Sequence, residues 1–212
     1  MMTSGDGRSP EEPRLLMHRE MAGDLRLIAS LIDMRMTALE DAEGLVALRQ
    51  VRGLIRSMAL AHGTAYEAGT GGMVSARRLM EKLVKSTRLT HCTRTWITTA
   101  VDAGAVKIPA ASAVPLALAV SELIRESVLR SLDGMAEGSI TLTVREDEHR
   151  YTITIADSGF GGSDMRGGEE ETTIGTIVAD HIVHYRLKGT IERQEGDGRT
   201  RVITFPKPAG PT

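Results

Sequence analysis

Aromatic side chains are scarce in this chain of 212 residues, where they make up only 3% of the sequence. Hydrophobic residues still account for 41%, so we expect a core built from Leu, Ile, Val, Ala and Met. The single cysteine, Cys92, excludes an intramolecular disulfide and leaves a cysteine-based metal site without a second ligand. We therefore assign no metal site.

Neither sign of charge dominates, since the formal net charge is -2. A balance of this kind gives no general attraction to nucleic acid or to an anionic membrane. No apolar run approaches the roughly 20 residues of a membrane span, and the polar N-terminus lacks the basic-then-apolar pattern of a signal peptide. We therefore expect a cytoplasmic protein that binds neither nucleic acid nor a membrane.

The clearest periodic pattern lies within residues 15–35. Its large apolar side chains recur at spacings of four, three and four, at Met21, Leu25, Ile28 and Ile32. This spacing predicts an amphipathic helix with one face for another helix. We place the helix from about Arg14 to about Leu39, after a disordered tail at residues 1–13.

A second amphipathic helix is predicted from about Leu45 to Glu67, after a turn at residues 40–44. Residues 14–68 would then form an antiparallel helical hairpin. Two helices alone cannot bury both of their apolar faces, and a second copy is the simplest way to cover them. We therefore predict a homodimer with a four-helix bundle at its two-fold axis.

The glycine-rich segment 68–72 is the predicted domain boundary, because the sequence pattern changes after it. Helices are expected at residues 74–89, 114–132 and 173–186, and strands at 94–101, 139–145, 151–156, 189–194 and 199–205. Thr and Ile alternate in the second and third of these strands, as in half-buried antiparallel strands. The fold class is therefore α+β: a helical hairpin, then an α/β sandwich over residues 73–206 and a tail at 207–212.

His18 stands out because it lies three residues before Met21, near the upper end of the apolar stripe. A histidine at a helix end is most often satisfied by water or by a carbonyl group. The alternative is a nucleophile that carries a phosphoryl group, since histidine can form covalent intermediates. These residues alone leave both interpretations open.

The second helix carries the most specific motif of the chain. Its members are Arg52, Ile55, residues 57–60 (Ser-Met-Ala-Leu), His62 and Tyr66. They are similar to the Arg-Ile-x-Ser-Met-Ala-Leu-x-His-x-x-Tyr run of one subfamily of sensor histidine kinases. With the order of the elements, this motif makes residues 15–206 resemble a sensor histidine kinase catalytic core. That core is a dimerisation and histidine-phosphotransfer hairpin followed by a Bergerat-type ATP-binding domain.

The resemblance implies a phosphoacceptor in the first helix. The phosphorylated histidine of the family generally precedes an Arg, and His18 precedes Arg19 here. Aligning the helix on Leu25 instead places His18 on the first of the family's two histidines and Arg19 on the second, a register that differs by one residue and would remove the nucleophile. Glu20 and Asp24 are close in sequence and could orient the ring. His62 would be a structural residue at the end of the hairpin.

The resemblance also implies a nucleotide site. Residues 115–132 are similar to the Asn-box helix and match it at Glu122, while Glu126 replaces the Asn that would ligate Mg²⁺. Residues 157–161 match the Asp-x-Gly-x-Gly box, in which Asp157 would recognise the adenine amino group. The same residues would also suit an ordinary strand-to-loop turn.

The glycines of this site are only partly retained. Gly159 and Gly161 belong to the Asp-x-Gly-x-Gly box, and Gly175 alone remains of the later Gly-x-Gly-Leu box. The carboxylate at 126 adds a charge beside a polyanion, and two unit charges about 4 Å apart repel by roughly 4 kcal/mol at a dielectric of 20. Residues 169–171 add three more glutamates. The site is therefore expected to be degenerate, and we assign no cofactor; ATP and Mg²⁺ would bind only if it still works.

Three functions follow from the resemblance. The protein would be a phosphorelay histidine phosphotransferase that passes phosphoryl groups between response-regulator receiver domains through His18. Alternatively, it would be an autophosphorylating histidine kinase without a sensor domain, or a pseudokinase adaptor. The changes in the phosphate site favour the first function, and the nearly intact Asp157 box favours the second.

Overall fold

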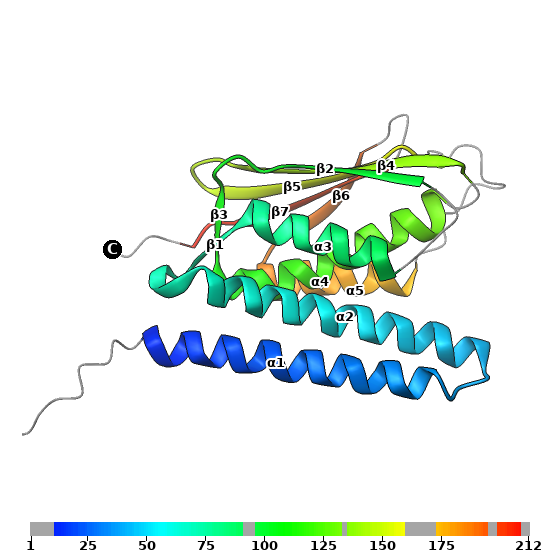
Figure 1. Cartoon of the computed structure of the whole chain (residues 1–212). Helices are drawn as coiled ribbons and strands as arrows, with labels where there is room; N and C mark the ends of the chain where they lie inside the picture. The colour runs from blue at the N-terminus through cyan, green and yellow to red at the C-terminus, as the bar shows by residue number, and fades with distance from the viewer. Residues whose placement is uncertain (1–10, 91–95, 133–134, 160–172, 195–198, 209–212) are drawn as a thin grey trace, which may run out of the picture.

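The computed structural model describes residues 11–90, 96–132, 135–159, 173–194 and 199–208. A helical hairpin lies beneath an α/β sandwich, in which helices cover one face of a five-stranded sheet (Figure 1). This arrangement confirms the predicted α+β fold. The layers from bottom to top are α1, then α2, then the helices of the sandwich, then the sheet.

The hairpin consists of α1 (Glu11–Met36) and α2 (Ala42–Glu67). The first helix begins three residues earlier than predicted, because Pro13 is tolerated in a first turn, whose N–H groups have no intrahelical acceptor. The second helix also begins earlier, because Asp41 caps it: its Oδ2 accepts a hydrogen bond from the Gly44 N–H at 2.7 Å. An Asp in this position satisfies one of the free donors of the first turn.

Small side chains set the contact between the two helices. Ala22 and Ala29 are buried on α1, with 1% and 3% of their surface exposed, and they allow the helices to approach closely. The predicted stripe therefore flanks this contact line, and Met21 and Ile28 stay exposed. At the turn end of the hairpin, Asp33 accepts hydrogen bonds from Arg52 and from Arg56, the latter at 2.8 Å.

The main sheet has the strand order β2-β4-β5-β7-β6. Its strands are β2 (Trp96–Asp102), β4 (Glu137–Glu146), β5 (Arg150–Asp157), β6 (Thr190–Gln194) and β7 (Arg199–Pro206). Only β2 and β4 run parallel, and the other neighbours pair antiparallel. The helices are α3 (Ala76–Thr90), α4 (Ala110–Glu126) and α5 (Ile174–Ile182), and π-helical turns extend α4 and α5 through Ser127–Ser131 and Val183–Leu187.

The start of the third predicted helix is occupied by a strand instead. Residues 73–75 form a short strand, β1 (Met73–Ser75), which pairs with β3 (Lys107–Pro109). Val74 is fully buried and lies opposite Ile108 in this pair. The tertiary contact of a β-branched residue thus overrides the local helical pattern, and α3 starts at Ala76.

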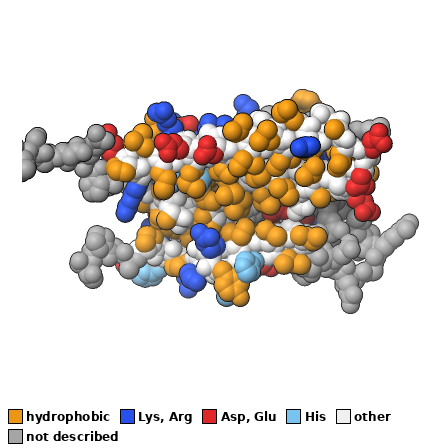
Figure 2. All heavy atoms as spheres, turned by 90° about the horizontal axis from the view of Figure 1, so that it is seen from below, with side chains coloured by type: hydrophobic (Ala, Val, Ile, Leu, Met, Phe, Trp, Pro, Cys, Tyr) orange, Lys and Arg blue, Asp and Glu red, His pale blue; other side chains and the backbone are white. Residues whose placement is uncertain are grey.

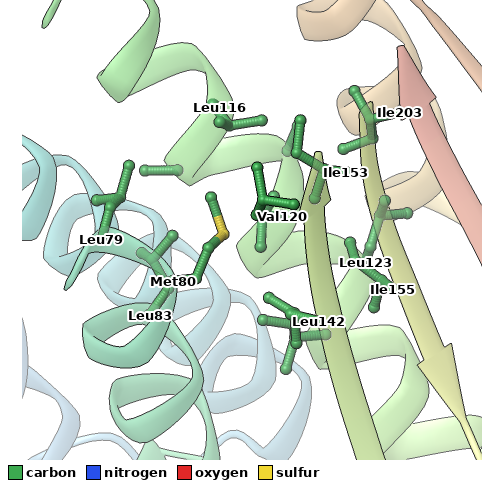
Figure 3. Close-up of a cluster of buried hydrophobic side chains, with 14 of the residues drawn as sticks. Leu79, Met80, Leu83, Leu116, Val120, Leu123, Leu142, Ile153, Ile155 and Ile203 are labelled. Atoms are coloured by element: carbon green, nitrogen blue, oxygen red, sulfur yellow. The ribbon is translucent and has the colours of Figure 1, made fainter. Parts of the chain in front are cut away.

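The core lies between the sheet and helices α3 and α4, and it is aliphatic as predicted (Figure 3). The drawn side chains come from both layers: Leu79, Met80, Leu83, Leu116, Val120, Leu123, Leu142, Ile153, Ile155 and Ile203. The rare aromatic residues support its edge, where the rings of Tyr151 and Phe205 lie 5.1 Å apart.

Helix α2 is shared between the two parts of the molecule. It packs on α1 on one side and on α3 and α4 on the other. Its Ser57 hydroxyl lies 2.6 Å from that of Ser121 on α4, in a buried contact. Within the described ranges, no helix is both long and apolar enough to cross a membrane.

Candidate functional site

The hairpin brings together two histidines that are 44 residues apart in sequence. Nδ1 of His18 lies 2.8 Å from Nδ1 of His62, and the ring centroids are 5.1 Å apart. His18 is partly exposed near the start of α1, whereas His62 on α2 keeps only 7% of its surface exposed. The side chain that contacts the His18 ring is therefore His62, and within the described residues neither Glu20 nor Asp24 forms a hydrogen bond or ion pair with that ring.

Both histidines favour the neutral state. Burial lowers the pKa of His18 below 6.5, and burial together with the charge that His18 would carry lowers the pKa of His62. A hydrogen bond between two neutral imidazoles requires one ring to donate its Nδ1–H and the other to accept with the Nδ1 lone pair. The pair therefore consists of two opposite tautomers.

A second set of predicted residues lies on the far side of α2, at the sheet. Asp157 is the last residue of β5, in which buried side chains alternate with more exposed ones. Its side chain therefore points to the same buried face as those of Ile153 and Ile155. One carboxylate oxygen, Oδ1, accepts a hydrogen bond from the Gly159 N–H at 3.0 Å. The other, Oδ2, is buried and has no hydrogen-bond partner among the described residues. A buried acceptor of this kind is costly unless a donor reaches it.

Glu126 ends α4 and forms ion pairs with two arginines of β7. Its Oε1 lies 3.1 Å from Nη1 of Arg199 and 3.9 Å from Nη2 of Arg201. All three side chains are largely buried, with at most 16% of any of them exposed. The carboxylate at the family's Mg²⁺-ligand position is therefore held by cations of its own chain.

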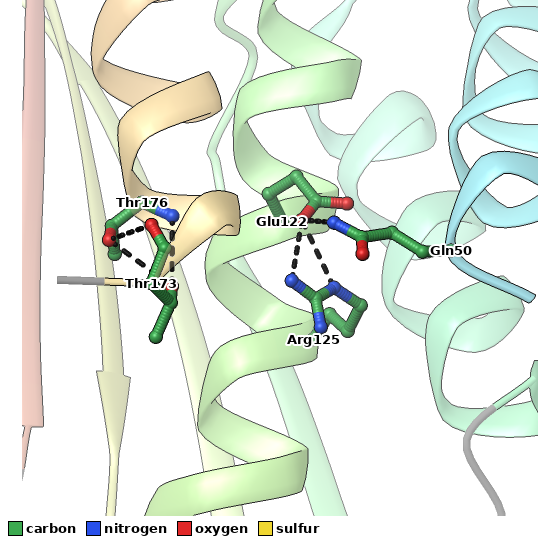
Figure 4. Close-up of polar contacts among 5 residues, drawn as sticks. All are labelled: Gln50, Glu122, Arg125, Thr173 and Thr176. Carbon is green, nitrogen blue, oxygen red and sulfur yellow. Dashed lines mark hydrogen bonds and ion pairs between the residues drawn. The ribbon is translucent and has the colours of Figure 1, made fainter. Parts of the chain in front are cut away.

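Glu122 lies one turn earlier on α4 and is also paired with an arginine of the chain (Figure 4). Its Oε2 accepts hydrogen bonds from Nη2 of Arg125 at 2.8 Å and, at a longer 3.4 Å, from Gln50 of α2. The first turn of α5, capped by Thr173, lies beside this pair.

Gly175 makes that close approach possible. A Cβ atom at this position would lie 2.4 Å from Nη2 of Arg125 and 2.7 Å from Oε2 of Glu122. A helix N-terminus attracts anions through its free N–H groups and its dipole. Here a carboxylate of the chain itself already lies near that terminus.

The two sets of residues are far apart along α2. Gln50, which contacts Glu122, precedes His62 by 12 residues. At about 1.5 Å of rise per residue, the α4 contact lies about 18 Å along the helix from the histidine pair. Helix α2 also lies between α1 and α4.

Residues 17–91 match the family model HisKA_2, which is described as Histidine kinase. The histidine kinase domain of the Erythrobacter litoralis EL346 blue-light activated histidine kinase is similar in structure, with a TM-score of 0.63 and 15% identity over 86% of this chain and 96% of that one. The chain has the fold of a histidine kinase catalytic core.

Two further solved structures have the same fold. A longer structure of the Erythrobacter litoralis EL346 protein gives a TM-score of 0.67 and 14% identity over 97% of this chain, but only 63% of that chain is covered. The Acinetobacter baumannii histidine kinase AdeS gives 0.53 and 15%, over 88% and 98% of the two chains. No curated protein matches the sequence. Histidine kinase-type domains are the modules of two-component signalling, which is the general class of this chain.

The residues of this histidine kinase core fit only part of Mg²⁺-ATP. The unpaired Oδ2 of Asp157 suits the amino group of an adenine. The metal and phosphate end does not fit, because Glu126 is bound by two arginines and Gly175 packs against the Glu122–Arg125 pair.

Gly161, residues 169–171 and Cys92 lie outside the described residues. Gly159 is buried, and its N–H donates to Asp157 Oδ1. The partners Arg199 and Arg201 were missed by sequence reasoning, because no local pattern links β7 to α4.

The contact between the histidines was missed as well, although the sequence holds a signal for it. His18 and His62 each lie 22 residues from Glu40. In an antiparallel hairpin, residues equally distant from the turn lie opposite each other. A turn centred at Glu40 would therefore have predicted the pair.

Proposed function

We propose that this protein is a histidine phosphotransferase of a two-component phosphorelay, in which His18 passes phosphoryl groups between receiver domains of cytoplasmic response regulators. The observation that carries the proposal is the state of the phosphate end of the nucleotide site. Glu126, Arg199 and Arg201 form a buried ion cluster there, and Glu122 with Arg125 lies against Gly175. A histidine that receives no phosphoryl group from ATP needs another donor.

The layout of the chain supports an external donor. The α4 contact lies about 18 Å along α2 from His62, and α2 separates α4 from α1. A receiver domain can instead approach the exposed side of α1. Exposed Leu16, Met17 and Met21 lie close to His18 in sequence on that helix and give such a partner apolar surface to contact.

The chemistry needs a neutral imidazole with a free lone pair. Burial keeps the pKa of His18 below its ordinary 6.5, so the ring is mostly neutral at neutral pH. In the transfer step a ring nitrogen of His18 forms a bond to phosphorus. The bond between phosphorus and the receiver's carboxylate oxygen breaks, and the carboxylate leaves with the electron pair. The reverse step passes the group to a second receiver.

We also propose that the protein is a homodimer through α1. Beyond the surface near His18, four large apolar side chains in the C-terminal half of this helix are exposed (Figure 2): Leu27, Ile28, Leu31 and Met34. At 100° per residue they form an arc roughly opposite Ala22 and Ala29, which face α2. Apolar faces of this length on a helical hairpin are suited to a second copy of the same hairpin.

A second candidate function is favoured by one observation. The Oδ2 atom of Asp157 is buried and has no partner within the part of the chain that the structure describes, and an adenine amino group would supply a donor. If the nucleotide bound productively, the protein would be an autophosphorylating histidine kinase. This function requires the ion cluster at Glu126 to open, because its carboxylate is already paired.

The two candidates differ in the source of the phosphoryl group. We would offer the protein either labelled Mg²⁺-ATP or a receiver domain carrying a labelled aspartyl phosphate. The proposal predicts acid-labile label from the receiver only, lost in His18→Ala and retained in the control His149→Ala, whose histidine lies in the exposed β4–β5 turn. Label arriving from ATP would favour the kinase, and receiver-derived label that persists in His18→Ala would refute the role of His18.

A further inference from the structure

The contact between His18 and His62 also restricts which nitrogen of each ring carries the proton. Two imidazole rings meet through the same atom type, Nδ1 to Nδ1, at 2.8 Å. Each neutral ring has a single N–H, so the bond forces the two rings into opposite tautomers. Only two arrangements satisfy it.

The two arrangements differ in whether His18 keeps a nitrogen lone pair that can attack phosphorus. If His18 donates its Nδ1–H, its Nε2 keeps a lone pair and can attack phosphorus. If His18 accepts at Nδ1, its only proton is on Nε2, and neither nitrogen has a lone pair available for attack. Among the described residues, Nε2 of His18 forms no hydrogen bond, and the side chain is partly exposed.

We propose that His62 is the positioning residue of the phosphoacceptor: it accepts the Nδ1–H of His18 and thereby fixes the tautomer in which Nε2 of His18 is the nucleophile. The reactive part of this proposal rests on the proposed function of His18. The tautomer itself does not, because it is a property of the resting protein.

The hydrogen bond also provides a route by which the His18 ring can lose the positive charge that phosphorylation creates on it. When Nε2 of His18 forms its bond to phosphorus, the ring becomes an imidazolium that still carries the Nδ1 proton. This proton can pass along the 2.8 Å contact to the Nδ1 lone pair of His62, and His62 then releases its Nε2 proton to water. The phosphorylated His18 ring is left neutral, and no further reactant is needed.

The surroundings of the pair suit such a role. His62 is held on α2, the helix that packs on both parts of the molecule, and it is buried. Burial lowers the pKa of both histidines, which disfavours an imidazolium with two N–H groups in the resting pair. A rigid, neutral acceptor is what orients a ring before reaction.

The first test is nitrogen NMR of the full, unphosphorylated chain labelled with ¹⁵N at histidine. The shifts of Nδ1 and Nε2 report which nitrogen carries the proton. We expect His18 in the Nδ1–H form in the unmutated protein and in His62→Asn, whose amide oxygen can take the place of the Nδ1 acceptor. We expect a shift toward the Nε2–H form in His62→Ala and none in the control His149→Ala.

The second test is the rate of transfer from a phosphorylated receiver domain. His62→Ala should accept phosphoryl groups roughly a hundredfold more slowly, in the range typical for loss of a proton acceptor. His62→Asn should recover part of the rate, since it orients the ring but cannot take the proton. Circular dichroism of each variant checks that the fold is retained.

The outcomes separate this proposal from the proposed function. An Nε2–H tautomer of His18 in the unmutated protein, or a tautomer unchanged in folded His62→Ala, overturns the positioning role whatever the phosphotransfer result. If the tautomer behaves as expected but no receiver transfers label, the proposed function fails while the ring orientation by His62 stands. An unchanged transfer rate in His62→Ala would show that the orientation has no catalytic effect.

Discussion

Replacing Glu126 with Ala tests how strongly its carboxylate, at the position predicted to ligate Mg²⁺, is held by ion pairs with Arg199 and Arg201. The substitution removes one partner of an ion cluster in which Arg199 and Arg201 are 16% and 10% exposed. Breaking a buried pair from one side costs about 3–5 kcal/mol, because the remaining charge stays buried. The arginines keep some access to water, so we expect the lower end, about 3 kcal/mol.

The chain offers a matched control in Glu67→Ala. Glu67 is a glutamate in the last turn of the α-helical part of α2, as Glu126 is in α4, so both changes remove the same side chain from a helix and differ mainly in the burial of the ion pair that is lost. Glu67 pairs with Lys82 at 2.7 Å, but its side chain is 44% exposed. An exposed pair contributes only about 0–1 kcal/mol.

Thermal unfolding should separate the two variants clearly. For a protein of this size, 1 kcal/mol shifts Tm by about 2–4 °C. Glu126→Ala should therefore lower Tm by about 6–12 °C, and Glu67→Ala by no more than about 4 °C. Equal shifts in the two variants would refute the reasoning, because they would mean that Glu126 is not committed to a buried cluster and remains available to a metal ion.

Two further predictions concern the hairpin. Because the pKa values of His18 and His62 are lowered in the fold, the unfolded chain binds more protons, and stability should fall as pH drops below the unfolded value of about 6.5. Urea titrations at several pH values measure this slope, which should be flatter in the double variant with Gln at both positions; a slope that is the same in both proteins contradicts the assignment. Ile28→Asp places a charge on the exposed apolar face of α1 and should give monomers, whereas Ser30→Asp, outside the apolar arc, should leave the dimer intact. Light scattering measures both, and a monomeric unmutated protein would exclude the dimer.

Much of the fold follows from short-range patterns. The alternation in β4 and β5 predicted both strands and their antiparallel pairing, because one side of the sheet faces the helices. The same alternation extends to Asp157, so its inward direction was accessible from sequence once Tyr151, Ile153 and Ile155 were taken as buried. The two hairpin helices follow from their apolar periodicity.

Long-range contacts explain what could not be predicted. Glu126 meets Arg199 only because β7 lies beside the end of α4 in the folded chain, 73 residues away, and no local spacing encodes that meeting. The strand at Val74 was not predicted for a related reason, because it forms only through its pairing with the strand that contains Ile108. The stripe of large side chains did not identify the face of α1 that contacts α2, because alanines form that face.

The position of α1 at the edge of the molecule has a consequence for hydrogen exchange. This helix packs on α2 and, near its N-terminal end, on the short 3₁₀ turn Gly69–Gly71, whereas α2 and α4 each pack against several elements. Elements with few buried contacts open at a lower free energy than the core. The amides of α1 should therefore exchange while those of α4 remain protected, so the segment that carries His18 can open and close while the sandwich stays folded.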